Sequence, residues 1–171
     1  MLLTESRAQA RVHEGILVPL DEQDRTLWDA AMIHEGHQLV RACLALNRPG
    51  PYQIQAATNA VHTDALDSSM TDWSQVVQLF DQLQAIAPSR VVALNRAVAV
   101  AEVDGPGVAL ALVDPLQLSS YHAWHATRAD LLRRMQRWDE ARDAYDRAIE
   151  RAGNDAERGF LRGRRDQLPP A

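Results

Sequence analysis

The sequence predicts an all-α fold of stacked antiparallel helical hairpins. Three observations support this prediction. No segment alternates apolar and polar residues long enough to form a core strand, helix caps and helix breakers recur along the chain, and the connections between the expected helices are short. Alanine and leucine are abundant, whereas aromatic residues make up only 5% of the 171 residues. Strong helix formers with small side chains favour closely packed helices.

Prolines and capping residues divide the chain into about eight to nine helices. Asp72 and Asn154 are predicted N-caps, and Pro88 is predicted to end a helix. The only β-like run, Ile16-Leu17-Val18, is expected to be a short extended piece in a loop. The expected helices span about residues 2–12, 23–47, 51–65, 73–87, 89–103, 107–114, 119–136, 138–152 and 154–168.

The length suits one domain, because 171 residues are too few for two well-developed cores. We therefore expect a single domain over residues 1–171. Within it we expect an N-terminal helix and loop over residues 1–20 and an irregular hairpin over residues 21–70. Repeat units and a C-terminal helix are expected over residues 71–171.

The composition excludes several classes of protein. All 18 basic residues are arginine, so lysine-dependent phosphate loops, Schiff-base enzymes and kinase-type ATP sites are excluded. A net charge of −5 argues against direct DNA binding by the chain. The single cysteine, Cys43, fits a cytoplasmic location, and neither a signal peptide nor a membrane span is expected.

The clearest internal repeat lies near the C-terminus. Ala141, Tyr145 and Ala148 are spaced i, i+4 and i+7, which places them on one helix face. This arrangement resembles the second helix of a tetratricopeptide repeat, in which hairpins stack into a right-handed superhelix. An upstream copy, offset by 65 residues, has corresponding residues at Trp73, Val76, Phe80 and Leu83. A generic helix bundle with coincidental spacing remains the alternative.

Stretches spread over nearly the whole chain carry a further resemblance. They include Leu17-Val18-Pro19-Leu20, Arg48-Pro49-Gly50-Pro51-Tyr52-Gln53 and Leu94-Asn95-Arg96-Ala97-Val98-Ala99, together with residues 22–25, 28–29, 54–57, 60–62, 71–73, 88–89, 92–93, 121–122, 125–126 and 128–134. These stretches resemble the C-terminal tetratricopeptide-like extension of a group of bacterial extracytoplasmic-function sigma factors. The histidines of residues 32–37 depart from that pattern.

In that family, an N-terminal half binds core RNA polymerase and reads the promoter, and this chain lacks those regions. The resemblance therefore implies a non-enzymatic role in regulating transcription initiation. It implies a protein partner, either the sigma regions or RNA polymerase, and no direct contact with DNA. A small-molecule-sensing helical domain with a polar pocket is the alternative function.

Polar side chains suggest where such a partner or ligand binds. Tyr52, Gln55, Asn59 and His62 follow one stripe of an expected helix, which would line the concave surface of a hairpin array. The alternative is that this stripe makes internal hydrogen bonds that fix helix packing. Further candidate binding residues are Asn95, Arg96, His122 and His125.

No catalytic residue, metal site or cofactor is expected. His34 and His37 are three residues apart, whereas the histidines of a metalloprotease helix are four apart. No obvious third ligand accompanies them. His122 and His125 have no serine, cysteine or carboxylate arranged with them in a recognised catalytic motif.

Overall fold

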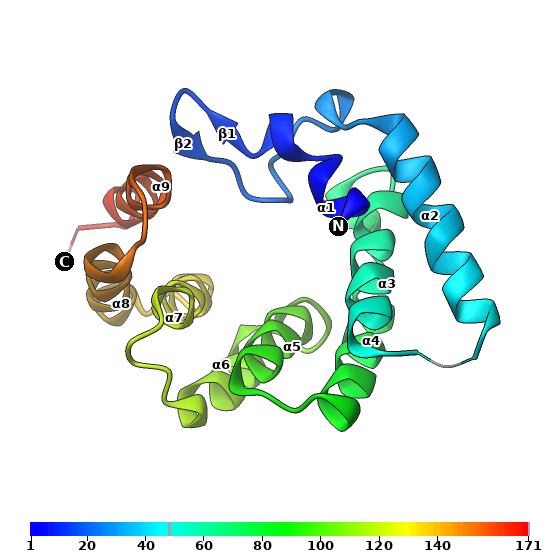
Figure 1. Ribbon diagram of the computed structural model, residues 1–171. Coiled ribbons are helices and arrows are strands. Elements are labelled where there is room, and N and C mark those ends of the chain that lie inside the picture. The colour runs from blue at the N-terminus through cyan, green and yellow to red at the C-terminus, as the bar shows by residue number, and fades with distance from the viewer. Residues whose placement is uncertain (48, 171) are drawn as a thin grey trace. The chain divides into compact units, whose positions relative to one another are not determined.

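The computed structural model describes residues 1–47 and 49–170, which contain nine α-helices, four short 3-10 helices and one two-stranded sheet (Figure 1). The all-α prediction is therefore confirmed. The chain divides into two compact units. The first unit comprises Met1–His13 and Val18–Val92, and the second comprises Glu14–Leu17 and the chain from Ala93 onward. The expectation that these units behave as a single domain stays a prediction.

The first unit is built around three long helices that follow one another in the chain. Helix α3 packs against both α2 and α4, and the short α1 packs against α2 and α3. The elements of this unit are α1 (Leu2–Glu5), η1 (Ala8–Ala10), β1 (Val12–His13), η2 (Arg25–Leu27), α2 (Ala30–Ala45), α3 (Pro51–Asp64), η3 (Ser68–Met70), α4 (Trp73–Ile86) and the first turn of α5 (Arg90–Val103).

Side-chain caps explain where the long helices of the first unit begin. The carboxylate of Asp29 accepts a hydrogen bond from the Met32 amide at 2.9 Å, and that of Asp72 accepts one from the Gln75 amide at 2.9 Å. Pro51 occupies the first turn of α3, where its missing N–H is not needed. Buried apolar side chains then hold the helices together: Leu3, Ile54, Ala57, Val76 and Leu83.

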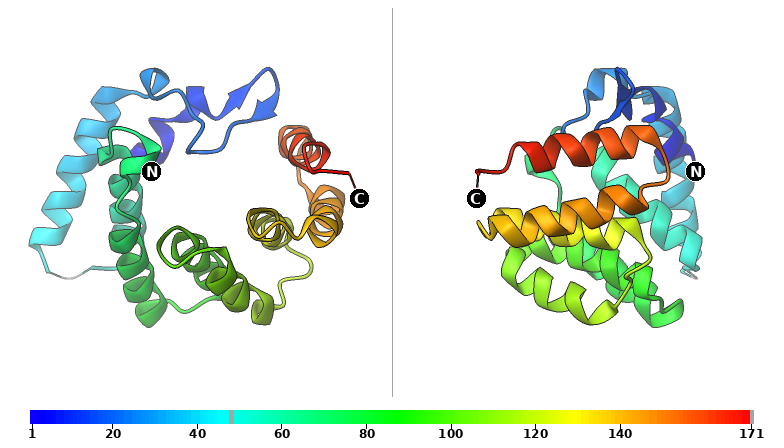
Figure 2. Two further views of the ribbon diagram at one scale, coloured as in Figure 1. Left: turned by 180° about the vertical axis from the view of Figure 1, so that it is seen from behind. Right: turned by 90° about the vertical axis from the view of Figure 1, so that its left-hand side faces the viewer.

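The second unit is a stack of helices joined by short connections (Figure 2). Helix α7 packs against α6 and α8, and α8 packs against α9. Gln136 adopts a left-handed φ of 61° in the tight turn that reverses the chain between α7 and α8. The elements of this unit are β2 (Ile16–Leu17), most of α5, α6 (Pro106–Val113), η4 (Asp114–Leu116), α7 (His122–Arg134), α8 (Trp138–Arg151) and α9 (Asp155–Asp166).

The predicted inward face of α8 is confirmed. Ala141, Tyr145 and Ala148 are all buried and belong to the apolar core of the second unit. The small alanines allow α8 to approach its neighbours closely, while the ring of Tyr145 fills the space between them. The indole of Trp124 adds a cross-link, because its Nε1 donates to the carbonyl of Val113 at 2.9 Å.

Three predicted helix boundaries were wrong. The helix expected over residues 2–12 is interrupted: α1 ends at Glu5, and η1 and β1 follow. The helix expected from residue 23 begins at Ala30, because Asp24 caps the separate η2 and Asp29 caps α2. Helix α7 begins at His122 rather than at residue 119, beyond the left-handed Gln117. No helix in the described parts of the chain is long and apolar enough to cross a bilayer.

Candidate functional site

The polar stripe predicted on α3 divides into an outward half and an inward half. Tyr52 is 83% exposed, and Gln55 is exposed as well. Asn59 and His62, further along the same helix, are half-buried. The outward half is therefore free for contact with a partner, whereas the inward half takes part in the packing of the first unit.

Asn59 links α3 to the N-terminal segment. Its Oδ1 accepts a hydrogen bond from Nη2 of Arg7 at 2.8 Å, and its Nδ2 donates to the carbonyl of Gln55 at 2.9 Å. The hydroxyl of Thr4 also approaches Oδ1, at 3.5 Å. Both ends of the amide are thus engaged within the first unit, which favours the packing alternative for this residue.

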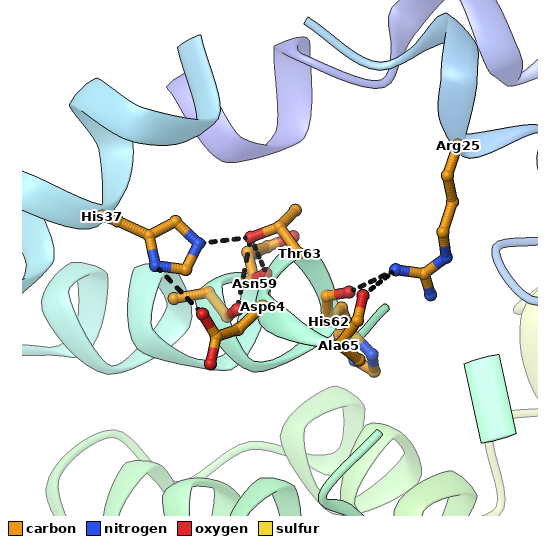
Figure 3. A network of polar contacts seen from close by, with 8 residues as sticks. Arg25, His37, Asn59, His62, Thr63, Asp64 and Ala65 are labelled. Atoms are coloured by element: carbon orange, nitrogen blue, oxygen red, sulfur yellow. Dashed lines mark hydrogen bonds and ion pairs between the residues drawn. The ribbon is translucent and has the colours of Figure 1, made fainter. Parts of the chain in front are cut away.

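His62 lies in a packed and positively charged environment. Its ring meets Trp73 edge-on, with the ring centroids 5.2 Å apart. Burial lowers the pKa of His62 to about 4, and the nearby positive charges of Arg7 and Arg25 contribute to this shift. The imidazole is therefore neutral at pH 7. Its backbone carbonyl accepts a hydrogen bond from Arg25 (Figure 3).

Two arginines share the indole of Trp28. The Cζ atom of Arg25 lies 4.4 Å from the ring centroid, and that of Arg7 lies 5.8 Å from it. Arg7 and Trp28 are each only 8% exposed. Both distances are within the range of a cation–π interaction. The sequence alone did not predict this cluster.

The hydrogen bonds of these arginines go to neutral oxygens. Nε of Arg7 donates to the carbonyl of Leu3 at 3.3 Å, and Nη1 of Arg25 donates to the carbonyls of His62 and Ala65 at 3.1 and 2.6 Å. Arg11 donates to the carbonyl of Thr4. Burial lowers the pKa of Arg7, and the charges of Arg11 and Arg25 lower it further. We call Arg7, Arg11, Arg25 and Trp28 the arginine–tryptophan cluster.

His37 is held between α2 and α3. Its Nε2 lies 2.9 Å from the hydroxyl of Thr63, and its Nδ1 lies 4.0 Å from the carboxylate of Asp64 (Figure 3). His34 instead contacts the side chain of Gln38 at 2.8 Å. Among the described residues, no three His, Cys, Asp or Glu side chains are grouped as metal ligands.

The remaining predicted site residues belong to the second unit. On α5, Asn95 is exposed and Arg96 is half-buried. His122 lies at the start of α7, with its Nε2 3.6 Å from the carboxylate of Glu157. These residues lie in a different unit from the α3 stripe, so a single surface that combines them stays a prediction.

His125 has a structural environment. It is buried, its Nε2 donates to the carbonyl of Ser119 at 2.8 Å, and its ring meets Trp124 edge-on at 4.8 Å. Burial lowers its pKa. Its other ring nitrogen, Nδ1, is buried without a hydrogen-bond partner among the described residues. The contact with Ser119 fixes the segment that leads into α7.

Large apolar side chains are exposed where α2 ends and α3 begins. Leu46 is 73% exposed, and Leu39 and Leu44 on α2 are about half exposed. Tyr52 follows in the first turn of α3. Only Gly36 is buried among the sixteen residues of α2. We call Leu39, Leu44, Leu46 and Tyr52 the α2–α3 apolar surface.

The chain is similar to known sequences over its first quarter and over its whole length. Residues 1–44 match a family of unknown function, DUF6596. Over 171 residues the chain is 45% identical to "Uncharacterized protein R00370" of Rhizobium meliloti (strain 1021), a match that covers 98% of this chain and 40% of that protein. The chain thus spans less than half of this relative's length. No solved structure matches the chain.

Proposed function

We propose that the chain is a non-enzymatic regulatory region of a bacterial extracytoplasmic-function sigma factor. In this proposal it binds the sigma regions or RNA polymerase and thereby modulates transcription initiation. The proposal draws on the sequence stretches that resemble the extension of such factors. The similarity to a relative more than twice as long is compatible with a region attached to other parts of a protein.

The α2–α3 apolar surface is the observation that carries the proposal. Exposed apolar clusters with polar rims are typical of protein-binding surfaces. Tyr52 supplies an aromatic anchor of the kind that dominates interface energies, and Gln55 supplies a polar group one turn further along α3. A helix that buries little of its apolar side within its own unit is suited to binding a helix of another protein.

Charge supports a protein partner over a nucleic acid. Residues 1–118 contain 7 arginines against 14 acidic residues. The α2–α3 apolar surface lies within this acidic part of the chain, which would repel a phosphate backbone.

A pull-down experiment tests this function. The chain would be immobilised and mixed with the two sigma regions of a factor of the resembled family, with and without core RNA polymerase. We expect saturable capture. The double variant Leu44→Asp and Tyr52→Ala should weaken capture by about ten-fold or more, because it removes two exposed apolar side chains, one from each helix.

Leu112→Asp provides the matched control, because Leu112 is an exposed leucine of α6 in the second unit. It should leave capture unchanged. The proposal is wrong if neither sigma regions nor polymerase bind the folded chain. The assignment of the surface is wrong if the double variant binds as tightly as the control.

A further inference from the structure

The arginine–tryptophan cluster differs from the other arginines in how its charge is balanced. In the second unit, seven arginines pair with carboxylates at 3.1 Å or less: Arg128, Arg133, Arg134, Arg137, Arg151, Arg158 and Arg165. Arg7, Arg11 and Arg25 contact only carbonyl and amide oxygens, and none of them pairs with a carboxylate in the described part of the chain. The cluster therefore has no closely paired carboxylate among the described residues, although the charge of Arg25 reaches Asp67 and helps to lower the pKa of that carboxyl.

A cluster of this kind is costly unless something balances it. Arg7 is almost fully buried, and its pKa is lowered by burial and by two neighbouring arginines. Guanidinium groups stay charged in proteins, so the repulsion among the three remains. The imidazole of His62 is neutral at pH 7, so it adds no charge to the cluster. An anion at the cluster would remove this repulsion.

Hydrogen-bond donors at the cluster are also unused. Nε1 of Trp28 is buried and has no acceptor among the described residues. Arg25 bonds both carbonyls at the end of α3 through Nη1, and its Nε and Nη2 make no hydrogen bond in the described structure (Figure 3). A buried donor without a partner costs free energy, and two adjacent guanidinium nitrogens form a fork that matches an oxyanion.

We infer that the arginine–tryptophan cluster is a binding site for a small phosphate-bearing anion. The free fork of Arg25 holds two oxygens, Arg11 adds a second positive charge, and the buried Arg7 supplies a fixed field. Trp28 positions both stacked guanidinium groups and offers its Nε1 as a further donor. Arg25 is half-buried, so part of its side chain is exposed to solvent. This inference does not depend on the proposed sigma-factor function.

A purely structural role is the competing explanation. Arg25 bonds the last carbonyls of α3, and Arg7 and Arg11 bond those of α1, which is how cations stabilise helix C-termini. That role does not use Nε1 of Trp28 or the free nitrogens of Arg25. If the cluster is an anion site, removing these donors should weaken anion binding. If its role is only structural, the same variants should leave anion binding unchanged.

Calorimetric titration of the chain with inorganic phosphate, at constant pH and ionic strength, tests the inference. We expect one saturable site. Arg25→Gln should weaken phosphate binding by about ten-fold or more, since a charge-assisted fork is lost. Trp28→Phe keeps a smaller ring for stacking and removes the N–H donor together with part of the indole, so it should weaken phosphate binding several-fold, and circular dichroism checks that the variant stays folded.

Arg90→Gln is the matched control, because Arg90 is an exposed arginine of the same unit. It should bind phosphate like the unmodified chain. The inference is overturned if phosphate does not bind saturably, or if Arg25→Gln and Trp28→Phe bind it as tightly as Arg90→Gln while all are folded by circular dichroism. Acetate is the carboxylate probe, and equal affinity for acetate would overturn the assignment to phosphate.

Discussion

Arg25 and Trp28 form a stacked pair in which the guanidinium lies 4.4 Å from the indole centroid. The same guanidinium donates to the carbonyls of His62 and Ala65, at the C-terminal end of α3. One side chain therefore joins the η2 segment to a helix that lies about 40 residues later in the chain. The pair therefore helps to fix the geometry of the first unit at the arginine–tryptophan cluster.

Replacing Arg25 should loosen this connection. Arg25→Met keeps an apolar side chain over Trp28 and removes two hydrogen bonds to α3 together with the cation–π interaction. We expect the free energy of unfolding to fall by about 1–3 kcal/mol. Urea denaturation followed by circular dichroism measures the change. Arg41→Met, at an exposed position of α2, is the control and should have little effect.

Acid should destabilise the first unit through His62. Its pKa in the folded chain is lowered to about 4 from an ordinary value of 6.5. As the pH falls through 6.5 the unfolded chain binds the proton first, so stability is lost progressively down to pH about 4. The loss is at most about 3 kcal/mol. Above pH about 7.5 both states are neutral at this residue, and His62 contributes no pH dependence.

Urea denaturation at a series of pH values measures this effect. His62→Gln should flatten the profile between pH about 4 and 6.5. A residual slope is expected from His125, because burial lowers its pKa in the same direction. His13→Gln, at an exposed position of β1, should retain the full slope. An identical slope in His62→Gln and the unmodified chain would contradict the assignment.

The sequence predicted helices best where a strong cap starts them. Asp72 and Asn154 each accept the expected amide hydrogen bond, and α4 and α9 begin directly after them. Between residues 21 and 30 two aspartates compete as caps, and the chain uses both, for η2 and α2. Local propensity cannot choose between adjacent caps, because tertiary contacts such as Arg25 with α3 decide where the first turn stops.

The candidate site was predictable only in part. Helical spacing placed Tyr52, Gln55, Asn59 and His62 on one stripe, but it could not show that the second half of the stripe faces the N-terminal segment and α4. The arginine–tryptophan cluster was missed for a related reason. Its members are close in space because of long-range packing, and the short spacing of Arg25 and Trp28 alone carries no specific signal.

Gly36 should be intolerant of a side chain. A Cβ at this position would lie 2.5 Å from Cδ2 and 2.6 Å from Cγ of Leu3, which is buried. Gly36→Ala should therefore lower the free energy of unfolding by about 1–3 kcal/mol, despite the better helix propensity of alanine. Gly163→Ala, on α9 with no neighbouring atom within 4 Å, is the matched control and should stabilise the chain slightly.

The second change that tests this contact is Leu3→Ala in the Gly36→Ala background. Shortening Leu3 makes room for the new methyl group, so the double variant should lose less stability than the sum of the single variants. Thermal or urea denaturation of the unmodified chain, the two single variants and the double variant provides the double-mutant cycle. If the stability losses of the two single variants simply add up in the double variant, the contact with Leu3 is not the reason why residue 36 must be glycine.

Ala148 tests whether close helix packing holds the second unit together. It is fully buried on α8, within the core that includes Ala141 and Tyr145. Ala148→Leu inserts three carbons where neighbouring helices meet, and we expect a loss of about 1–3 kcal/mol in the free energy of unfolding. Ala111→Leu makes the same change at an exposed position of α6 and should stay within about 0.5 kcal/mol of the unmodified chain. Similar unfolding midpoints for the two variants in urea would mean that α8 does not depend on a small residue here, and the tetratricopeptide-like interpretation of this face would be wrong.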